Sequence, residues 1–208
     1  MANNTKPVQR VRAAIFNLPN QLTSLRLLLS VVLFCFIVYE HYMTSMWLFI
    51  VAAGTDWLDG YYARKYNEVT TLGRILDPFA DKVIVCGTFI FIMAAIAGNA
   101  GMAKDPWGLK AWMIVVLVGR ELLVTALRSF IEDRGSDFSA KMSGKLKMVL
   151  QCVAAGVCLF CLSYETQHAR DAAAWCWWLM VVSIWSALVL TVYSGVVYIF
   201  VAVRLLRE

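Results

Sequence analysis

Four aspartates lie close together in an apolar part of this chain, at Asp56, Asp59, Asp77 and Asp81. With two glycines, an alanine and an arginine they form the pattern D-x2-D-G-x2-A-R-x8-G-x3-D-x3-D. Four clustered carboxylates repel one another unless cations bind them or some of them take up protons. Because oxygen ligands favour hard ions, the pattern predicts a site for one or two divalent ions, Mg²⁺ or Mn²⁺, rather than zinc or copper.

The small residues and the arginine of this pattern indicate which ligand such ions would help to bind. Gly60 and Gly73 carry no side chain, so a ligand can approach their backbone closely, and Ala63 is nearly as small. Arg64 is suited to a bidentate contact with a phosphate. Two ions could clamp a pyrophosphate and neutralise charge on a leaving group. The alternative is that the aspartates cap helices and pair with nearby cations, but capping needs one residue per helix rather than four.

A second group of charges follows further along the chain. Arg120 and Glu121 interrupt an apolar segment, and Arg128 comes two helical turns after Arg120. Lys145 lies near the start of the next apolar segment. A cationic pocket for a second, anionic substrate would explain Arg120, Arg128 and Lys145. For Lys147, ordinary flanking of a membrane span by positive charge is an equally good explanation.

The segments that carry these charges are apolar enough to cross a membrane. Of the 208 residues 61% are hydrophobic and 16% are charged, which is unusual for a soluble domain. A span needs roughly 20 mostly apolar residues, and residues 83–103 and 172–203 contain no Asp, Glu, Lys or Arg. The sequence therefore predicts an all-α polytopic membrane protein with six transmembrane helices, near residues 22–40, 45–66, 78–98, 111–132, 146–164 and 175–203.

The distribution of charge predicts how these spans are oriented. Most of the Lys and Arg residues fall on one side of the predicted membrane, so the termini and the aspartates are expected to face the cytoplasm, in a cell inner (cytoplasmic) membrane. This distribution argues against a nucleic-acid partner for the net charge of +5. Residues 1–17 are predicted to form a cytoplasmic segment beside the membrane, with a short basic amphipathic stretch over residues 8–16, and residues 18–208 the membrane domain. The six cysteines lie in apolar segments and are interpreted as small packing residues.

The spacing of the aspartates on the predicted helices indicates how they would meet. Asp56 and Asp59 are three residues apart and Asp77 and Asp81 are four apart, so each pair lies on one helix face. A short loop after Tyr66 would bring the two helix ends together. The third span is expected to begin near Asp77, with Asp77 as a cap and the following proline in the first turn. Likewise, Asn20 is expected to cap the first span.

The aspartate pattern resembles the signature of the CDP-alcohol phosphatidyltransferases. Its fixed positions are all met here, by Asp56, Asp59, Gly60, Ala63, Arg64, Gly73, Asp77 and Asp81. A pattern of this length and rigid spacing is highly specific. Together with the layout of six spans, the resemblance covers about residues 18–203.

The resemblance implies a role for the matched residues. It implies a two-metal centre held by Asp56, Asp59 and Asp77, with Asp81 sharing the second metal and acting as the general base. It implies contacts to the CDP part of CDP-diacylglycerol from Asn20, Thr23, Gly60, Ala63, Arg64, Thr70 and Gly73. Members of this family are commonly homodimers whose nucleotide pocket opens sideways to the lipid.

Three further stretches, residues 17–26, 119–128 and 144–148, resemble family members whose acceptor is sn-glycerol 3-phosphate. Met148 departs from them, because they usually carry Thr there. The implied reaction transfers the phosphatidyl group from CDP-diacylglycerol to glycerol 3-phosphate and gives phosphatidylglycerophosphate and CMP, in the synthesis of anionic phospholipids. The cationic group Arg120, Arg128 and Lys145 would hold the acceptor phosphate. The alternatives are the same chemistry with inositol phosphate, serine or phosphatidylglycerol as acceptor and, from a different class, a divalent-cation or anion transporter.

Overall fold

The computed structural model describes residues 18–66, 71–98, 108–132, 142–167 and 174–207, and all of their secondary structure is helical. Side chains are described at residues 21, 23–54, 79–98, 108–131, 146–165 and 175–204. The helices in the described ranges are α1 (Leu18–Val38), α2 (Tyr42–Tyr66), α3 (Thr71–Gly98), α5 (Ala111–Glu132), α6 (Met142–Gln167) and α7 (Ala174–Arg207). The predicted amphipathic segment within residues 1–17 lies outside these ranges.

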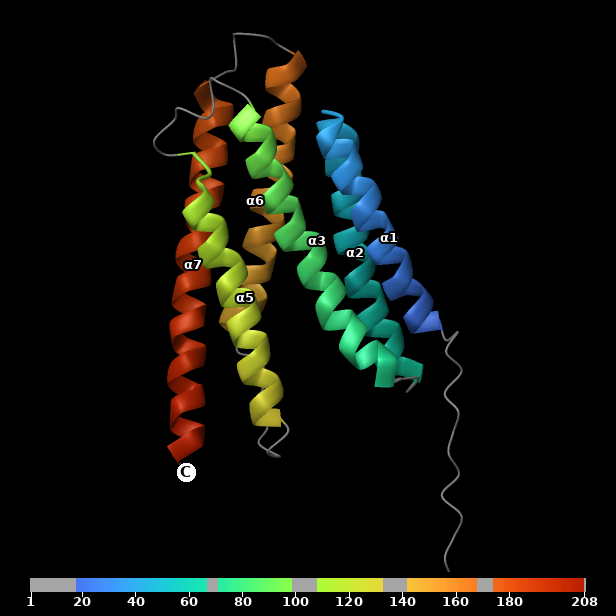
Figure 1. Ribbon diagram of the computed structural model, residues 1–208, viewed down its shortest axis with the longest axis vertical. Coiled ribbons are helices and arrows are strands. Elements are labelled where there is room, and N and C mark those ends of the chain that lie inside the picture. Colours follow the sequence, from blue (N-terminus) through green and yellow to red (C-terminus); the bar gives the residue numbers. More distant parts are fainter. Residues whose placement is uncertain (1–17, 67–70, 99–107, 133–141, 168–173, 208) are drawn as a thin grey trace, which may run out of the picture.

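The helices run up and down the molecule in alternation (Figure 1). The end of α2, the start of α3 and the C-terminal end of α7 therefore lie at the same end of the bundle, which we call the aspartate end. In the bundle α1 packs along α2 and α3, and α7 packs along α5 and α6, while α6 also contacts α2 and α3. This alternation is the arrangement that the predicted spans require.

Three of the described helices contain stretches that are long and apolar enough to cross a membrane: Phe79–Gly98, Leu146–Glu165 and Trp175–Arg204. Helices α1 and α2 contribute the shorter apolar stretches Thr23–Val38 and Tyr42–Gly54. Many large apolar side chains along these helices point outward, such as Leu28, Val115 and Phe200. Outward apolar side chains on long apolar helices are typical of contact with lipid. The prediction of an all-helical membrane protein is confirmed at this level.

Two of the predicted helix starts are wrong. Helix α3 begins at Thr71 rather than near Asp77, so Asp77 and Pro78 lie in its interior. Proline has no backbone N–H and leaves the carbonyl of Arg74 without its usual helical donor, which is why the sequence indicated a helix start at this point. Similarly, α1 begins at Leu18, which places Asn20 in the first turn and not at the cap. Pro19 is tolerated in this first turn, because the N–H groups there have no partner within the helix.

Helices α1 and α2 pack against each other as an antiparallel hairpin with a short connection. The N–H of His41 donates to the carbonyl of Phe36 (2.9 Å), and the N–H of Glu40 donates to the carbonyl of Ile37 (3.1 Å). These two bonds are the Schellman arrangement that closes a helix with one left-handed residue. Glu40 takes that conformation, with φ at 62°.

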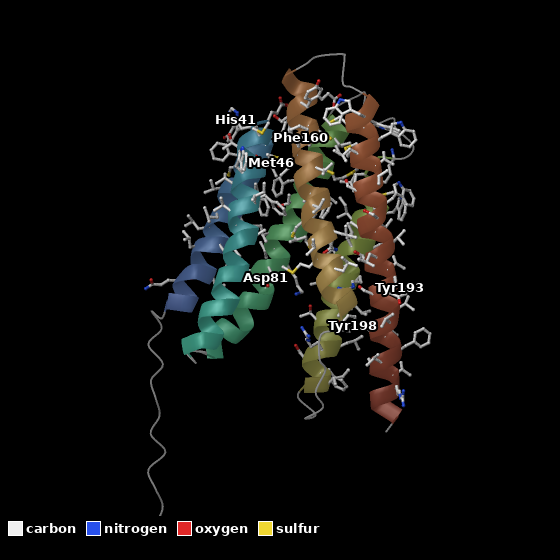
Figure 2. The ribbon with its side chains drawn as sticks, turned by 180° about the vertical axis from the view of Figure 1, so that it is seen from behind. His41, Met46, Asp81, Phe160, Tyr193 and Tyr198 are labelled. Atoms are coloured by element: carbon white, nitrogen blue, oxygen red, sulfur yellow. The ribbon has the colours of Figure 1, made fainter. Side chains whose placement is uncertain are left out.

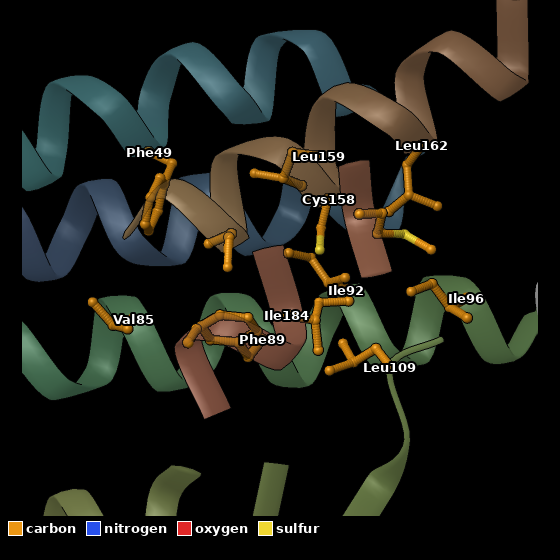
Figure 3. Packing of buried hydrophobic residues seen from close by; sticks show 14 of the residues in the cluster. Phe49, Val85, Phe89, Ile92, Ile96, Leu109, Cys158, Leu159, Leu162 and Ile184 are labelled. Atoms are coloured by element: carbon orange, nitrogen blue, oxygen red, sulfur yellow. The ribbon is translucent and has the colours of Figure 1, made fainter. Parts of the chain in front are cut away.

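The main buried core takes side chains from all six described helices, and Figure 3 shows part of it. Its largest fully buried side chains include Phe49, Phe89, Ile92, Leu159 and Ile184. In a membrane the lipid tails are as apolar as these side chains, so close packing rather than exclusion of water stabilises the contact. Small residues matter in such packing because they let helices approach closely.

Gly87 provides a test of this packing. An added Cβ at Gly87 of α3 would clash with Cζ of Phe34 in α1, and the Phe34 ring is itself stacked on Phe91 with 4.7 Å between the ring centroids. We expect Gly87→Ala to lower the free energy of unfolding by about 1–3 kcal/mol, because overpacking forces neighbours to move. Thermal unfolding in detergent measures this. Gly156→Ala is the matched control, since nothing lies within 4 Å of its added Cβ, and equal melting of the two variants would contradict the prediction.

Candidate functional site

The backbone places the predicted aspartates at one end of the bundle. Asp56 and Asp59 lie in the second half of α2, and Asp77 and Asp81 lie in the first half of α3. Five peptide units join Tyr66 to Thr71, so the two helix ends lie at most about 19 Å apart. Of the four aspartates, only Asp81 has a described side chain. The convergence of the four carboxylates therefore remains a prediction.

The other predicted nucleotide contacts are placed only in part. Thr23 lies in α1 and is buried. The structure describes only the backbone of Asn20 in α1, of Gly60, Ala63 and Arg64 in α2, of Gly73 in α3 and of Lys145 in α6. Thr70 lies outside the described residues. The roles of these residues accordingly stay predictions.

Asp81 pairs with an arginine that the sequence analysis did not assign to the site. Nη1 of Arg26 donates to Oδ1 of Asp81 over 2.6 Å. The Arg26 side chain is 2% exposed and that of Asp81 is 30% exposed. A charge-assisted bond of this length fixes the carboxylate and compensates its negative charge. The sequence contains a signal that could have assigned Arg26 to the site: Arg26 lies three residues after Thr23, on the same face of an apolar helix.

A cavity of about 260 Å³ opens beside Asp81, between α3, α5, α6 and α7. Figure 2 shows Asp81 on α3 and Tyr198 on α7, both in the half of the bundle that includes the aspartate end. The polar side chains that line the cavity are Asp81, Lys82, Arg120, Glu121, Thr125, Arg128, Lys147, Gln151 and Tyr198. Four of them are Lys or Arg and two are Asp or Glu, so the lining carries a formal excess of two positive charges. The structure thus places Arg120 and Arg128 in the lining of the same cavity as Asp81.

A larger cavity, of about 480 Å³, lies near the other end of the bundle. It is lined by residues of α1, α2, α3 and α6 and by Glu40. Its lining includes none of the predicted site residues. We therefore take the smaller, charged cavity as the candidate site.

Helix α7 holds Arg120 in place. Nη2 of Arg120 donates to Oγ of Ser194 over 2.6 Å, and its guanidinium carbon lies 5.6 Å from the centre of the Tyr198 ring. An added Cβ at Gly195 would lie 3.0 Å from Cγ of Arg120, so the glycine makes room for this side chain. Nε of Arg120 is buried and has no hydrogen-bond partner among the described residues. A fixed guanidinium with an unused N–H is suited to binding an anion.

Glu121 links α5 to α6. Its Oε1 accepts a hydrogen bond from Nζ of Lys147 and lies 3.4 Å from Nη1 of Arg120 and from Nε2 of Gln151. Gln151 in turn donates to the hydroxyl of Thr191 on α7 over 3.2 Å. The network joins three helices, and its carboxylate compensates part of the positive charge around the cavity. Lys147 thus lines the cavity, while the side chain of Lys145 lies outside the described side chains.

Removal of the Glu121 charge should weaken the bundle strongly. In Glu121→Gln the ammonium of Lys147, whose side chain is 6% exposed, would lose its carboxylate. Removal of one partner of a buried ion pair lowers the free energy of unfolding by about 3–5 kcal/mol, because the other charge is left uncompensated. Thermal unfolding in detergent checks this. The double variant Glu121→Gln, Lys147→Met should recover most of the loss, and a single variant that melts like the wild type would disprove the buried pair.

The fold and the site together define a class of protein. It is a helical membrane protein with a carboxylate and a positively charged cavity side by side, an arrangement that suits an anionic ligand. The chain belongs to the CDP-alcohol phosphatidyltransferase family, whose sequence model matches residues 16–193. It is therefore an enzyme of that class. The resemblance seen in the aspartate pattern is confirmed.

Individual relatives are similar over most of the chain. The CDP-diacylglycerol–glycerol-3-phosphate 3-phosphatidyltransferase of Bacillus subtilis (strain 168) is 33% identical over 198 residues, which are 87% of this chain and 92% of the relative. A protein of Mycobacterium tuberculosis (strain H37Rv) named probable phosphatidylglycerophosphate synthase is 35% identical over 93% of this chain and 85% of its own. The Escherichia coli (strain K12) protein with the same name as the Bacillus one is 32% identical over 67% of this chain and 74% of its own.

Membership of the family also indicates a requirement for a metal ion. CDP-alcohol phosphatidyltransferases generally depend on a divalent cation. Within the described side chains no group of three or more His, Cys, Asp or Glu could hold a metal ion. Three of the four predicted ligands lie outside those side chains, so the described part cannot contain the predicted centre. The donor set itself consists of oxygen only, which fits Mg²⁺ or Mn²⁺.

Proposed function

We propose that this enzyme transfers the phosphatidyl group of CDP-diacylglycerol to sn-glycerol 3-phosphate and so produces phosphatidylglycerophosphate and CMP. The names of the relatives in Bacillus subtilis and Escherichia coli support this reaction. The observation that carries the proposal is the cavity, in which Arg120 and Arg128 lie beside Asp81. Its excess of positive charge suits an acceptor that carries a phosphate, and an uncharged acceptor would leave that charge uncompensated.

The donor would bind at the aspartate end. We infer that Asp56, Asp59, Asp77 and Asp81 hold two divalent ions, Mg²⁺ or Mn²⁺. When bound, such ions neutralise the charge of the pyrophosphate and of the CMP that leaves. The CDP moiety would contact Asn20, Thr23, Gly60, Ala63, Arg64, Thr70 and Gly73, and Arg64 would contribute a further positive charge there.

The acceptor would bind in the cavity with its phosphate held by Arg120, Arg128 and Lys145, joined by Lys147. Asp81 lines the same cavity, so its carboxylate can take the proton of the attacking hydroxyl. The oxygen of that hydroxyl forms the new bond to the β-phosphorus as the bond to the CMP oxygen breaks, in line. Arg26 holds Asp81 from the side of α1.

The proposal includes the setting in the membrane. All six helices would cross a cell inner membrane, with the termini and the aspartate end in the cytoplasm and the acyl chains of the donor left in the bilayer. The excess of Lys and Arg in the segments at that end supports this orientation. We further propose a membrane domain over residues 18–208, preceded by a segment at the membrane surface over residues 1–17, and a homodimer.

Release of CMP by the purified enzyme in the presence of CDP-diacylglycerol tests the reaction. Glycerol 3-phosphate, inositol phosphate, serine and phosphatidylglycerol would each be supplied as the acceptor. We expect release with glycerol 3-phosphate, its loss with a chelator and its return with Mg²⁺ or Mn²⁺. Preference for another acceptor would overturn the proposed substrate, and activity that survives thorough chelation would overturn the proposed metal centre. CMP release that requires both substrates would also exclude the transporter alternative.

A further inference from the structure

Two cysteine thiols touch between α6 and α7, far from the charged cavity. Sγ of Cys176 lies 2.7 Å from Sγ of Cys161, and the thiol of Cys161 also lies 3.1 Å from the carbonyl oxygen of Cys176. Both residues are 3% exposed. They are 15 residues apart in the chain, so the packing of the two helices brings them together.

The pair lies near the end of the bundle opposite the aspartate end. Cys161 comes two turns before the end of α6, and Cys176 is the third residue of α7. Aromatic rings gather around it, with the centroids of Tyr164 and Trp175 5.7 Å apart. Clusters of Tyr and Trp are typical of the boundary between membrane and water. In the orientation proposed above, this boundary faces away from the cytoplasm.

We propose that Cys161 and Cys176 form a disulfide that joins α6 to α7. A disulfide requires sulfur atoms about 2.05 Å apart, and the two thiols already lie in direct contact. The two thiols lose two protons and two electrons, and a disulfide of a thiol oxidant outside the cytoplasm accepts them and becomes a dithiol. Such oxidants keep that compartment able to form disulfides, unlike the cytoplasm.

The disulfide would act on the position of the helices and not on the reaction. Gln151 of α6 and Thr191 of α7 belong to the network beside the cavity. Cys161 is ten residues from Gln151, about 15 Å along the helix, so the sulfur atoms do not contact substrate. The bond would hold α6 and α7 in register and so preserve the cavity at high temperature. This inference goes beyond the proposed reaction, and its main readout does not depend on activity.

The test measures the mass of the full-length protein from bacterial membranes. Free thiols are blocked with N-ethylmaleimide before lysis and again after denaturation, with and without reductant. We expect the unreduced protein to carry two fewer labels than the reduced one, and a cross-linked peptide to contain Cys161 and Cys176. Reduction should lower the melting temperature by roughly 5–10 °C, as for a disulfide that closes a loop of this length in a chain of this size.

A neighbouring cysteine serves as the control. Cys158 lies one turn before Cys161, is fully buried, and takes no part in the contact. Cys158→Ala should keep the two-label difference, and Cys161→Ser or Cys176→Ser should abolish it. Equal labelling of the wild-type protein with and without reductant would overturn the inference, whatever acceptor the enzyme uses. Because this outcome is read from the wild type, it does not depend on the folding of a variant.

Discussion

Asp81→Asn is expected to reduce the rate of CMP release by about 10²–10⁴-fold, the range that a general acid or base contributes. Asparagine has nearly the shape of aspartate, and its amide oxygen can still accept the hydrogen bond from Nη1 of Arg26. The amide, however, cannot take the proton of the attacking hydroxyl. The variant should therefore fold, bind CDP-diacylglycerol and fail in turnover.

Two measurements separate this explanation from loss of binding or folding. Calorimetric titration of the detergent-solubilised variant with CDP-diacylglycerol should show binding close to that of the wild type. Glu40→Gln makes the same chemical change at an exposed residue in the α1–α2 connection, at the far end of the bundle, and should leave turnover unchanged. If Asp81→Asn retains turnover near the wild-type rate, Asp81 is not the base.

Arg120→Lys is expected to raise KM for glycerol 3-phosphate by about 10–100-fold, since a hydrogen bond to a charged group contributes about 1.5–3 kcal/mol. Lysine keeps the charge but cannot reach Ser194, lie over the Tyr198 ring and contact the substrate at the same time. KM for CDP-diacylglycerol should stay unchanged, because none of the proposed donor contacts lies on α5, the helix that carries Arg120. Initial rates of CMP release, measured against each substrate in turn, give both constants.

Two serines of α7 provide a matched pair of variants that tests whether Arg120 binds the acceptor. Ser194→Ala removes the acceptor that holds Nη2 of Arg120 and should raise KM for glycerol 3-phosphate in the same direction, by less than Arg120→Lys. The hydroxyl of Ser183 donates to the carbonyl of Met180 in its own helix, so Ser183→Ala should have no such effect. A rise in KM for both substrates in Arg120→Lys would contradict a separate acceptor pocket and indicate general disorder of the site.

Much of the fold and of the family could be predicted because the signals are local. Apolar segments reveal membrane helices by their length and composition, and helical spacing pairs Asp56 with Asp59 and Asp77 with Asp81 without reference to the rest of the chain. The same local reasoning failed at Pro78. The missing N–H of proline is usually tolerated only in a first turn, yet α3 continues through this residue from Thr71.

The sequence by itself determined the aspartate pattern, the family and the presence of a cationic group in α5, since each depends on residue type and spacing. Only the tertiary structure decided the partners: Arg26 with Asp81, Arg120 with Ser194, and Lys147 with Glu121, which are 55, 74 and 26 residues apart. Such pairs depend on how each helix is rotated about its axis and set against its neighbours. Rotation follows from the packing of whole helices, which the spacing of residues within one helix does not reveal. For this reason the chemistry could be predicted from the chain, and the arrangement of the cavity could not.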